Sequence, residues 1–284
     1  MTQIGRSSRR HDIAVPERDG ARVTLSWSAA SDRGHRRAVN EDSLLARSPI
    51  FAVADGMGGH EAGDFASTAV ITRLAEQLGQ HFVASDEISD ALRAAVDDMT
   101  RGVGVTELGT GTTVTGLALT LRDGDPYWLV FNIGDSRVYE LQDGRLEQLT
   151  VDHSVVQQLL DRGMITAAEA EVHPHANVIT RAVGFNEDPV PDFWLMPIVA
   201  GSRLLVCSDG LTKELTEHGI RHFLTIGTSA ADAAGRLMEA ALGNGGRDNV
   251  SVIVIDVLGT PETAAVRPRT GGAGRRARSG PLPA

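Results

Sequence analysis

Five aspartates stand where apolar runs end or glycine turns begin, and they are scattered along the whole chain. They are Asp42, Asp55, Asp135, Asp209 and Asp248. Four of them follow or open strongly apolar runs, so we expect them to converge in the folded chain. Clustered carboxylates either shift their pKa values or hold cations. Because hard oxygen ligands suit Mg²⁺ or Mn²⁺ and not zinc, the pattern predicts a metal enzyme.

The elements that must position these aspartates are mainly strands. Alternating or continuous apolar runs predict strands at residues 23–27, 50–54, 112–121, 127–133, 137–141, 203–207 and 250–258. The gap between 127–133 and 137–141 is only Gly-Asp-Ser, which is the size of a hairpin loop. Apolar faces at helical spacing predict helices over 61–78, after Ser85 and after Ser229.

Strands with short connections, interrupted by blocks of helix, favour an α+β fold over a βαβ arrangement. We expect two antiparallel sheets with helices packed outside. Residues 1–20 lack a period and predict a flexible lead-in, and residues 21–258 predict one domain. Residues 259–284 are rich in Arg, Pro and Gly, which predicts a disordered basic tail.

Composition narrows the function classes. A net charge of −10 argues against general nucleic-acid binding, which needs a basic surface. No apolar run approaches the ~18 residues needed to cross a bilayer, and the first ten residues lack the apolar stretch of a secretory signal. The single cysteine, Cys207, fits a reducing compartment. These features predict a cytoplasmic protein that binds neither nucleic acid nor membrane.

The motifs, in their order along residues 24–257, resemble the metal-dependent protein phosphatases of the protein phosphatase 2C family, in its bacterial branch. The segments that carry the resemblance are Arg37-Ala-Val-Asn-Glu-Asp42, Asp55-Gly-Met-Gly-Gly59, Gly109-Thr-Gly-Thr-Thr113, Ile133-Gly-Asp-Ser-Arg137, Leu149-Thr-Val-Asp-His-Ser154, His173-Pro-His-Ala-Asn-Val-Ile-Thr-Arg-Ala-Val-Gly184, Cys207-Ser-Asp-Gly210 and Arg247-Asp-Asn-Val-Ser251. The resemblance implies two stacked antiparallel sheets flanked by pairs of helices. It also implies a serine/threonine protein phosphatase in which a hydroxide that bridges two Mn²⁺ or Mg²⁺ ions attacks phosphoserine or phosphothreonine.

The resemblance also implies roles for individual residues. Asp55 would bridge the two metals and the carbonyl of Gly56 would ligate one of them. Asp209 and Asp248 would complete the other site, while Glu41 and Asp42 would hold metal-bound waters. Arg37 would bind the phosphate, since a guanidinium can donate two hydrogen bonds to phosphate oxygens. With Arg37, Asp55 and Asp209 are the expected catalytic residues, and Asp135 would help to hold a weaker third cation.

Two positions depart from the family pattern. Some members carry a histidine directly after the Asp-Gly as a general acid, whereas this chain has Met57, which cannot donate a proton. A metal-bound water or His60 are alternative donors. The family often has an acidic residue four positions after the aspartate that matches Asp209, whereas this chain has its only lysine, Lys213. Either Lys213 pairs with Asp135 or Asp209 and weakens the third cation site, or it points to solvent.

Residues 171–184 are polar and rich in histidine, and they are a candidate mobile lid over the substrate. The spacing of His153, His173 and His175 does not form a closed tetrahedral zinc set. By family analogy, the expected partners are phosphorylated proteins, including a serine/threonine kinase and its substrates, and the expected state is a monomer. Two rival hypotheses are a catalytically silent phosphoprotein-binding module and an enzyme for small phosphate esters.

Overall fold

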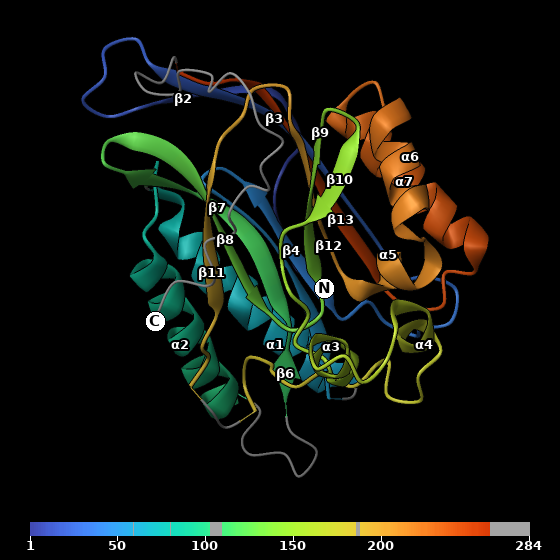
Figure 1. The fold of residues 1–284 in the computed structure, drawn as a ribbon. Coiled ribbons are helices and arrows are strands. Elements are labelled where there is room, and N and C mark those ends of the chain that lie inside the picture. Colours follow the sequence, from blue (N-terminus) through green and yellow to red (C-terminus); the bar gives the residue numbers. More distant parts are fainter. Residues whose placement is uncertain (59, 80, 103–109, 186–187, 262–284) are drawn as a thin grey trace.

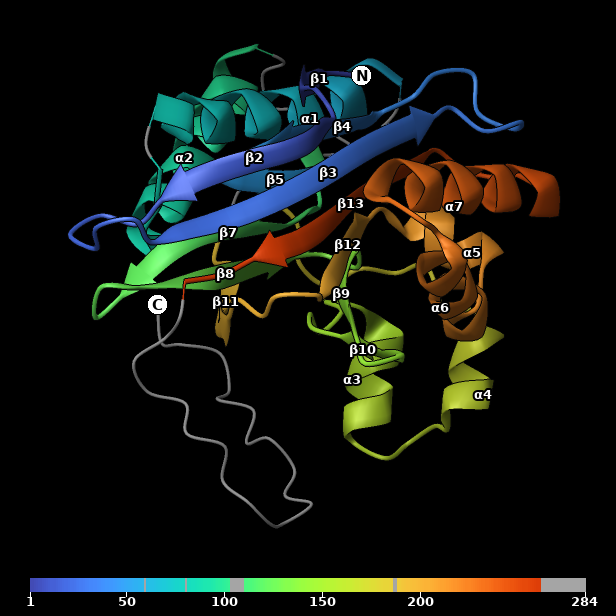
Figure 2. The ribbon, with the colours of Figure 1, turned by 90° about the horizontal axis from the view of Figure 1, so that it is seen from above.

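The computed structural model describes residues 1–58, 60–79, 81–102, 110–185 and 188–261. Two β-sheets lie against each other, with α-helices on both outer faces (Figures 1 and 2). This is the predicted α+β fold class. The predicted basic tail over 259–284 lies, from residue 262 onward, outside the described residues.

The first sheet has, in the described part of the chain, the strand order β1-β4-β5-β7-β8-β11, with β6 paired to β5. Its strands are β1 (Gln3–Gly5), β4 (Asp42–Arg47), β5 (Ile50–Met57), β6 (Gly111–Thr112), β7 (Val114–Arg122), β8 (Asp125–Ile133) and β11 (Asp192–Pro197). All of its pairs are antiparallel except β1 with β4, which is parallel. The sheet is therefore mixed, where an antiparallel sheet was predicted.

The second sheet, over the same described residues, has the order β10-β9-β12-β13-β3-β2 and is antiparallel throughout. Its strands are β2 (Ser8–Ala14), β3 (Arg22–Asp32), β9 (Arg137–Gln142), β10 (Arg145–Gln148), β12 (Arg203–Cys207) and β13 (Val250–Gly259). The strand predicted at 203–207 is thus confirmed with the same limits.

The helices cover the two outer faces. On the first sheet lie α1 (His60–Ala75), which runs into the 3₁₀ helix η1 (Glu76–Gly79), and α2 (Ser85–Gly102). On the second sheet lie α6 (Glu217–Ile226) and α7 (Ala230–Asn244), together with the short α5 (Asp209–Glu214). Two further short helices, α3 (Val155–Asp161) and α4 (Ala167–Glu171), lie in the segment between β10 and β11. None of the helices in the described ranges has both the length and the apolar character that a membrane crossing requires.

Burial on both faces explains why the central strands are continuously apolar. In β5, Ala52 and Ala54 point into the core beneath α1 and α2, while Phe51 and Val53 point into the core between the sheets. In β13, Ile253 faces the core between the sheets and its neighbours face the helical layer. Side chains alternate between the faces of a strand, so a strand with two covered faces needs apolar residues at every position.

Two predictions need correction. Residues 1–20 are not a flexible lead-in, because β1 and β2 pair with β4 and β3, and Ile13 is buried. Both are edge strands of the described sheets and bury few side chains, so they carry little periodic signal. The strands β8 and β9 do not form a hairpin, because Gly134-Asp135-Ser136 carries the chain from the first sheet to the second.

Candidate active site

The predicted carboxylates lie at strand ends of both sheets. Asp42 begins β4 and is the register partner of Asp55 in β5. Asp209 begins α5 directly after β12, and Asp248 lies just before β13, the antiparallel neighbour of β12. Asp135 lies in the crossover between β8 and β9. One antiparallel strand ends where its neighbour begins, at the same end of the sheet. This topology therefore brings together residues that are distant in the sequence.

The electrostatics show that these side chains are close neighbours. Burial raises the pKa of Asp42 to about 7, and the charges of Asp209 and Asp248 add to the increase. Burial, and then the charges of Asp42, Asp209 and Asp135, raise the pKa of Asp55 well above its usual range. Burial and the charge of Asp209 raise the pKa of Asp135 to about 7. A carboxyl group with a raised pKa, beside other carboxyl groups, is typical of a functional site.

Within the described residues, two cationic side chains contact this cluster. Lys213 Nζ lies 2.5 Å from Asp209 Oδ2 and 3.0 Å from Asp248 Oδ2. Arg37 Nε lies 2.8 Å from Asp248 Oδ1, and its Nη2 donates a 3.0 Å hydrogen bond to Asp248 Oδ2. Burial alone would raise the pKa of Asp248, but Lys213 and Arg37 outweigh this effect, so its pKa is lowered. The alternative in which Lys213 pairs with Asp209 is therefore confirmed, and the one in which it points to solvent is wrong. Asp248 is a second partner that was not predicted.

The Thr112–Thr113 pair fixes the backbone of Asp55. The N–H of Asp55 donates to Thr113 Oγ1 at 3.1 Å, and Thr112 Oγ1 donates to the Asp55 carbonyl at 2.9 Å. Thr113 Oγ1 also shares a hydrogen bond with Ser136 in the crossover. The threonines in the Gly109–Thr113 motif thus hold Asp55 in place, a role that the motif alone did not reveal.

Gly56 is required by a close approach of two backbones. A Cβ on Gly56 would lie 2.1 Å from the carbonyl oxygen of Gly63 in α1 and 2.7 Å from that of Glu41. No side chain fits in this space, so β5 and α1 can meet here only with glycine. This contact sets the backbone beside Asp55. That the Gly56 carbonyl ligates a metal stays a prediction.

Asn249 and Ser208 connect the segments that carry the carboxylates. Asn249 Oδ1 accepts from the Glu41 N–H, and its Nδ2 donates to the carbonyls of Arg33 and Val39. Asn249 therefore ties the loop beside Asp248 to the segment that precedes β4. Ser208 Oγ donates to Asp42 Oδ2, a contact that sequence reasoning missed. In the sequence, the indication that Ser208 belongs to the site was its position directly before Asp209.

The remaining candidates divide into structural and unassigned residues. His153 is buried, its Nδ1 accepts from the Gly134 N–H at 3.1 Å, and its Nε2 lies 3.2 Å from Asp192 Oδ2. It therefore supports the crossover that carries Asp135. Arg137 is structural, since it contacts both carboxylate oxygens of Asp152. The side chain of His60 lies outside the described part of the chain.

The donor set fits a hard divalent cation, although the side chains do not enclose one as they stand. Among the described residues, no three His, Cys, Asp or Glu side chains form a group that could hold a metal ion. Yet Asp42 Oδ1 and Asp209 Oδ1 are buried and have no hydrogen-bond partner in that part of the chain. A buried carboxylate oxygen without a partner is costly, and a cation beside it would offset that cost. Oxygen donors of this kind suit Mg²⁺ or Mn²⁺.

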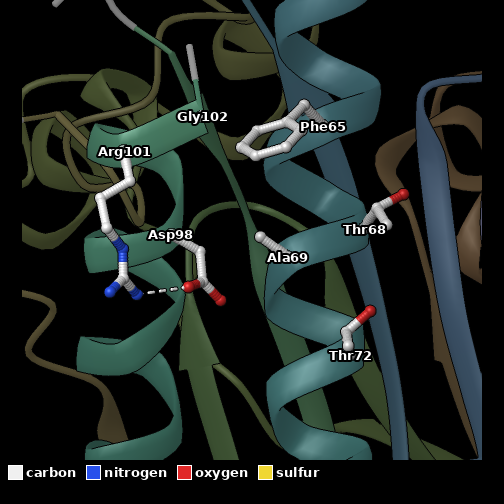
Figure 3. A pocket seen from close by; sticks show the side chains of 7 residues that line it. All are labelled: Phe65, Thr68, Ala69, Thr72, Asp98, Arg101 and Gly102. Atoms are coloured by element: carbon white, nitrogen blue, oxygen red, sulfur yellow. Dashed lines mark hydrogen bonds and ion pairs between the residues drawn. The ribbon is translucent and has the colours of Figure 1, made fainter. Parts of the chain in front are cut away.

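A separate groove lies between α1 and α2 (Figure 3). Its volume is about 370 Å³, and Phe65, Thr68, Thr72, Asp98 and Arg101 are among its lining residues. Asp98 is neutralised by Arg73 and Arg101. None of the predicted metal ligands lines this groove, so it is distinct from the carboxylate cluster.

Comparisons with known proteins agree with this geometry. Residues 32–244 match the family model for protein phosphatase 2C. The chain is 43% identical over 246 residues to the serine/threonine protein phosphatase PstP of Mycobacterium tuberculosis, covering 84% of this chain and 46% of PstP. It is 33% identical over 239 residues to the serine/threonine phosphatase Stp of Listeria welshimeri, covering 80% of this chain and 93% of Stp. The chain thus spans about half the length of PstP and most of the length of Stp.

A solved structure agrees as well. The catalytic domain of PstP in complex with two manganese ions superposes with a TM-score of 0.73 at 38% identity, covering 84% of this chain and 99% of that domain. The similarity therefore extends through both sheets and their helical layers.

Proposed function

Because the chain belongs to the protein phosphatase 2C family, we propose that it is a metal-dependent serine/threonine protein phosphatase, which hydrolyses phosphoserine and phosphothreonine. One observation carries the proposal. Carboxylates from both sheets meet where their strands end. Burial raises the pKa values of three of them, Asp42, Asp55 and Asp135. The half-exposed Arg37 lies beside the cluster. This combination suits the binding of cations together with a phosphate.

The carboxylates have separate roles in this proposal. Burial, followed by the charges of Asp42, Asp209 and Asp135, raises the pKa of Asp55, and Asp55 would bridge two ions. Asp209 and Asp248 would ligate one ion and the Gly56 carbonyl the other. Glu41 and Asp42 would hold metal-bound waters, and Asp135 would contribute to a weaker third site. When bound, two Mn²⁺ or Mg²⁺ ions would supply a water of lowered pKa and would shield the charge of the phosphoryl group.

Arg37 would orient the substrate. Its side chain is 48% exposed, and two of its nitrogens already contact the Asp248 carboxylate in a paired geometry. A planar guanidinium can present the same pair of donors to two phosphate oxygens. Binding in this way would align the phosphorus with the carboxylate cluster and would not transfer a proton.

The leaving alkoxide needs a proton that the residue after Gly56 cannot supply. Met57 lies at the end of β5 and its thioether has no acidic proton. The donors expected from the sequence are a metal-bound water and His60, and the side chain of His60 lies outside the described part of the chain. We propose the metal-bound water as the donor, since a cation lowers the pKa of the water it binds.

The finer features of the biology are also proposals. By analogy with relatives named as serine/threonine phosphatases, the substrates would be phosphorylated proteins, including a serine/threonine kinase and its targets. We further propose signalling in the cytoplasm and a monomeric state. Size-exclusion chromatography with light scattering tests the monomer, and comparison of phosphoproteins in cells with and without the gene tests the substrates.

The direct test measures phosphate release from a phosphothreonine peptide, with Mn²⁺, with Mg²⁺ and with neither ion. The isosteric variant Asp209→Asn should lose the metal-dependent release. The control Asp123→Asn changes a carboxylate that is 94% exposed and should keep it. Absence of release from folded wild-type protein in both metals would reject the enzyme and favour the phosphoprotein-binding module. Release from p-nitrophenyl phosphate, but from no phosphopeptide, would favour the enzyme for small esters.

A further inference from the structure

Lys213 is the only lysine among 284 residues, and its ammonium lies inside the carboxylate cluster. It follows Asp209 by four positions on α5 (Figure 1), so both side chains lie on one face of the helix. Its Nζ contacts one oxygen of Asp209 and one oxygen of Asp248. The proposed function assigns these same two carboxylates to one metal ion.

The ammonium joins two carboxylates that come from different segments of the chain. Asp209 begins α5, Asp248 lies before β13, and Lys213 Nζ contacts both. The side chain is 32% exposed, so most of it is withdrawn from water.

The backbone of Lys213 is held in place while its side chain is a flexible stem. Its carbonyl accepts a hydrogen bond from Arg247 Nη2, and the adjacent Glu214 is held by Arg247 Nε and the Arg247 N–H. These contacts fix the end of α5 against the loop before β13. The four-carbon stem of a lysine has the freedom to withdraw the ammonium from the cluster without any movement of that helix.

We propose that Lys213 is a tethered cation, which neutralises the Asp209–Asp248 pair in the metal-free protein and must leave that pair when a divalent cation binds there. This inference rests on the proposed function, because it assumes that the two carboxylates are metal ligands. An ammonium within hydrogen-bond distance of both carboxylates would repel a divalent ion between them. Lys213 therefore lowers the affinity for that ion and stabilises the metal-free fold.

Loss of the Lys213 charge should lower the stability of the metal-free protein but raise its affinity for the metal. A residue with a purely structural role would not raise the metal affinity when it is removed. Lys213→Met removes the charge and keeps an unbranched apolar stem. Without metal, the variant should unfold at a lower temperature, because the carboxylates repel one another. With saturating Mn²⁺, that loss should vanish or reverse. Removal of a unit charge at about 4 Å should raise the affinity for one Mn²⁺ ion by roughly ten- to a hundredfold.

The control is Arg236→Met. Arg236 pairs with Asp232 at the same four-residue spacing on α7 and does not contact the cluster. Mn²⁺ affinity and stoichiometry are measured by isothermal titration calorimetry on wild type, Lys213→Met, Arg236→Met and Asp209→Asn. Thermal unfolding of the same proteins is measured in EDTA and in Mn²⁺. Arg236→Met should change neither the affinity nor the difference between the two unfolding temperatures.

The single lysine also permits a direct readout that does not depend on activity. Protein grown with lysine labelled at Cε and Nζ gives one side-chain signal in NMR, and diamagnetic Mg²⁺ can be titrated against it. The signal should move from the position of a paired ammonium toward that of a solvated one. An unchanged signal at saturating Mg²⁺ would overturn the proposal.

The failure of this inference is distinguishable from the failure of the proposed function. If wild type binds Mn²⁺, Asp209→Asn weakens that binding and Lys213→Met leaves it unchanged, then the proposed metal site stands and the role of Lys213 is wrong. If neither wild type nor Lys213→Met binds Mn²⁺, both proposals fail. If Lys213→Met binds Mn²⁺ and wild type does not, the Lys213 ammonium blocks the metal site, and the proposal is supported.

Discussion

Ser208 Oγ donates a 2.9 Å hydrogen bond to Asp42 Oδ2, and Ser208 Oγ itself accepts one from the N–H of Ser251. Ser208 follows β12 in the second sheet, whereas Asp42 begins β4 in the first. One buried hydroxyl thus joins the two sheets at the carboxylate cluster. It also lowers the pKa of Asp42, against the larger effect of burial.

Ser208→Ala should weaken metal binding. Without the hydroxyl donor, the pKa of Asp42 should rise further, so less of the carboxylate is ionised at neutral pH. We expect Mn²⁺ affinity at pH 7 to fall roughly three- to tenfold, since a hydrogen bond to a charged group contributes about 1.5–3 kcal/mol, of which metal binding senses a part. Calorimetric titration of wild type and Ser208→Ala with Mn²⁺ measures this change in affinity. Ser202→Ala removes another buried hydroxyl, which donates to the Val199 carbonyl, and should leave the affinity unchanged.

The metal-free protein should become less stable as pH rises from about 4 to about 7. The pKa values of Asp42 and Asp135 are raised from 3.8 to about 7 in the folded chain. In this interval the folded state therefore binds more protons than the unfolded state, and the free energy of unfolding falls with increasing pH. Asp135→Asn should remove one such contribution, and so should stabilise the metal-free protein at pH 8 by roughly 1–3 kcal/mol more than at pH 4.

Urea unfolding in EDTA at pH 4, 6 and 8 measures this difference. An equal effect of Asp135→Asn at all three values would contradict the raised pKa of Asp135. The same raised pKa values predict that Mn²⁺ binding near pH 6 releases protons, because the ligands must ionise. Titrations in buffers of different ionisation enthalpy count these protons.

The Arg137–Asp152 pair should behave as a buried ion pair. Arg137 contacts both oxygens of Asp152, whose side chain is 8% exposed, and also donates to the Tyr139 hydroxyl. Arg137→Met should destabilise the protein by about 3–5 kcal/mol, because it leaves the buried Asp152 carboxylate without its counter-charge, with only the neutral amide of Gln148 still donating to it among the described contacts. The double variant Arg137→Met/Asp152→Asn should recover much of that loss. Additive losses in a double-mutant cycle by urea unfolding would argue against the coupling.

Much of the fold could be predicted because its central strands are buried on both faces. The runs that became β8, β12 and β13 are apolar at nearly every position. The helix α7 begins as expected, since Ser229 accepts from the Asp232 N–H. Periodicity failed where burial is slight, as in β2, in which only Ile13 is buried. The length of a gap also cannot show which sheet a strand joins, and this produced the incorrect hairpin.

Some features of the site could also be predicted from the sequence, and others could not. The motifs predicted that Asp42, Asp55 and Asp209 would converge, and the structure places Asp42 at the start of β4, Asp55 near the end of β5 and Asp209 after β12. The motifs could not show that the Ser208 hydroxyl reaches Asp42, or that Lys213 lies between Asp209 and Asp248. Those contacts depend on how β12, α5 and the loop before β13 pack against the first sheet. Packing of this kind leaves no periodic signal in the sequence.

Arg37 should be needed for substrate binding more than for metal binding. Its side chain is 48% exposed and its contacts with Asp248 are exchangeable for contacts with a phosphate. Removal of two charge-assisted hydrogen bonds should lower kcat/KM for a phosphopeptide by roughly 10²–10³-fold, with much of the loss in KM. Mn²⁺ affinity should rise slightly or stay unchanged, because Arg37→Ala also removes a cation from Asp248.

The adjacent Arg36 is exposed, and Arg36→Ala is the matched control. Steady-state kinetics with calorimetry separates the two effects, and a loss of Mn²⁺ affinity equal to the loss of kcat/KM would show that Arg37 supports the metal site instead.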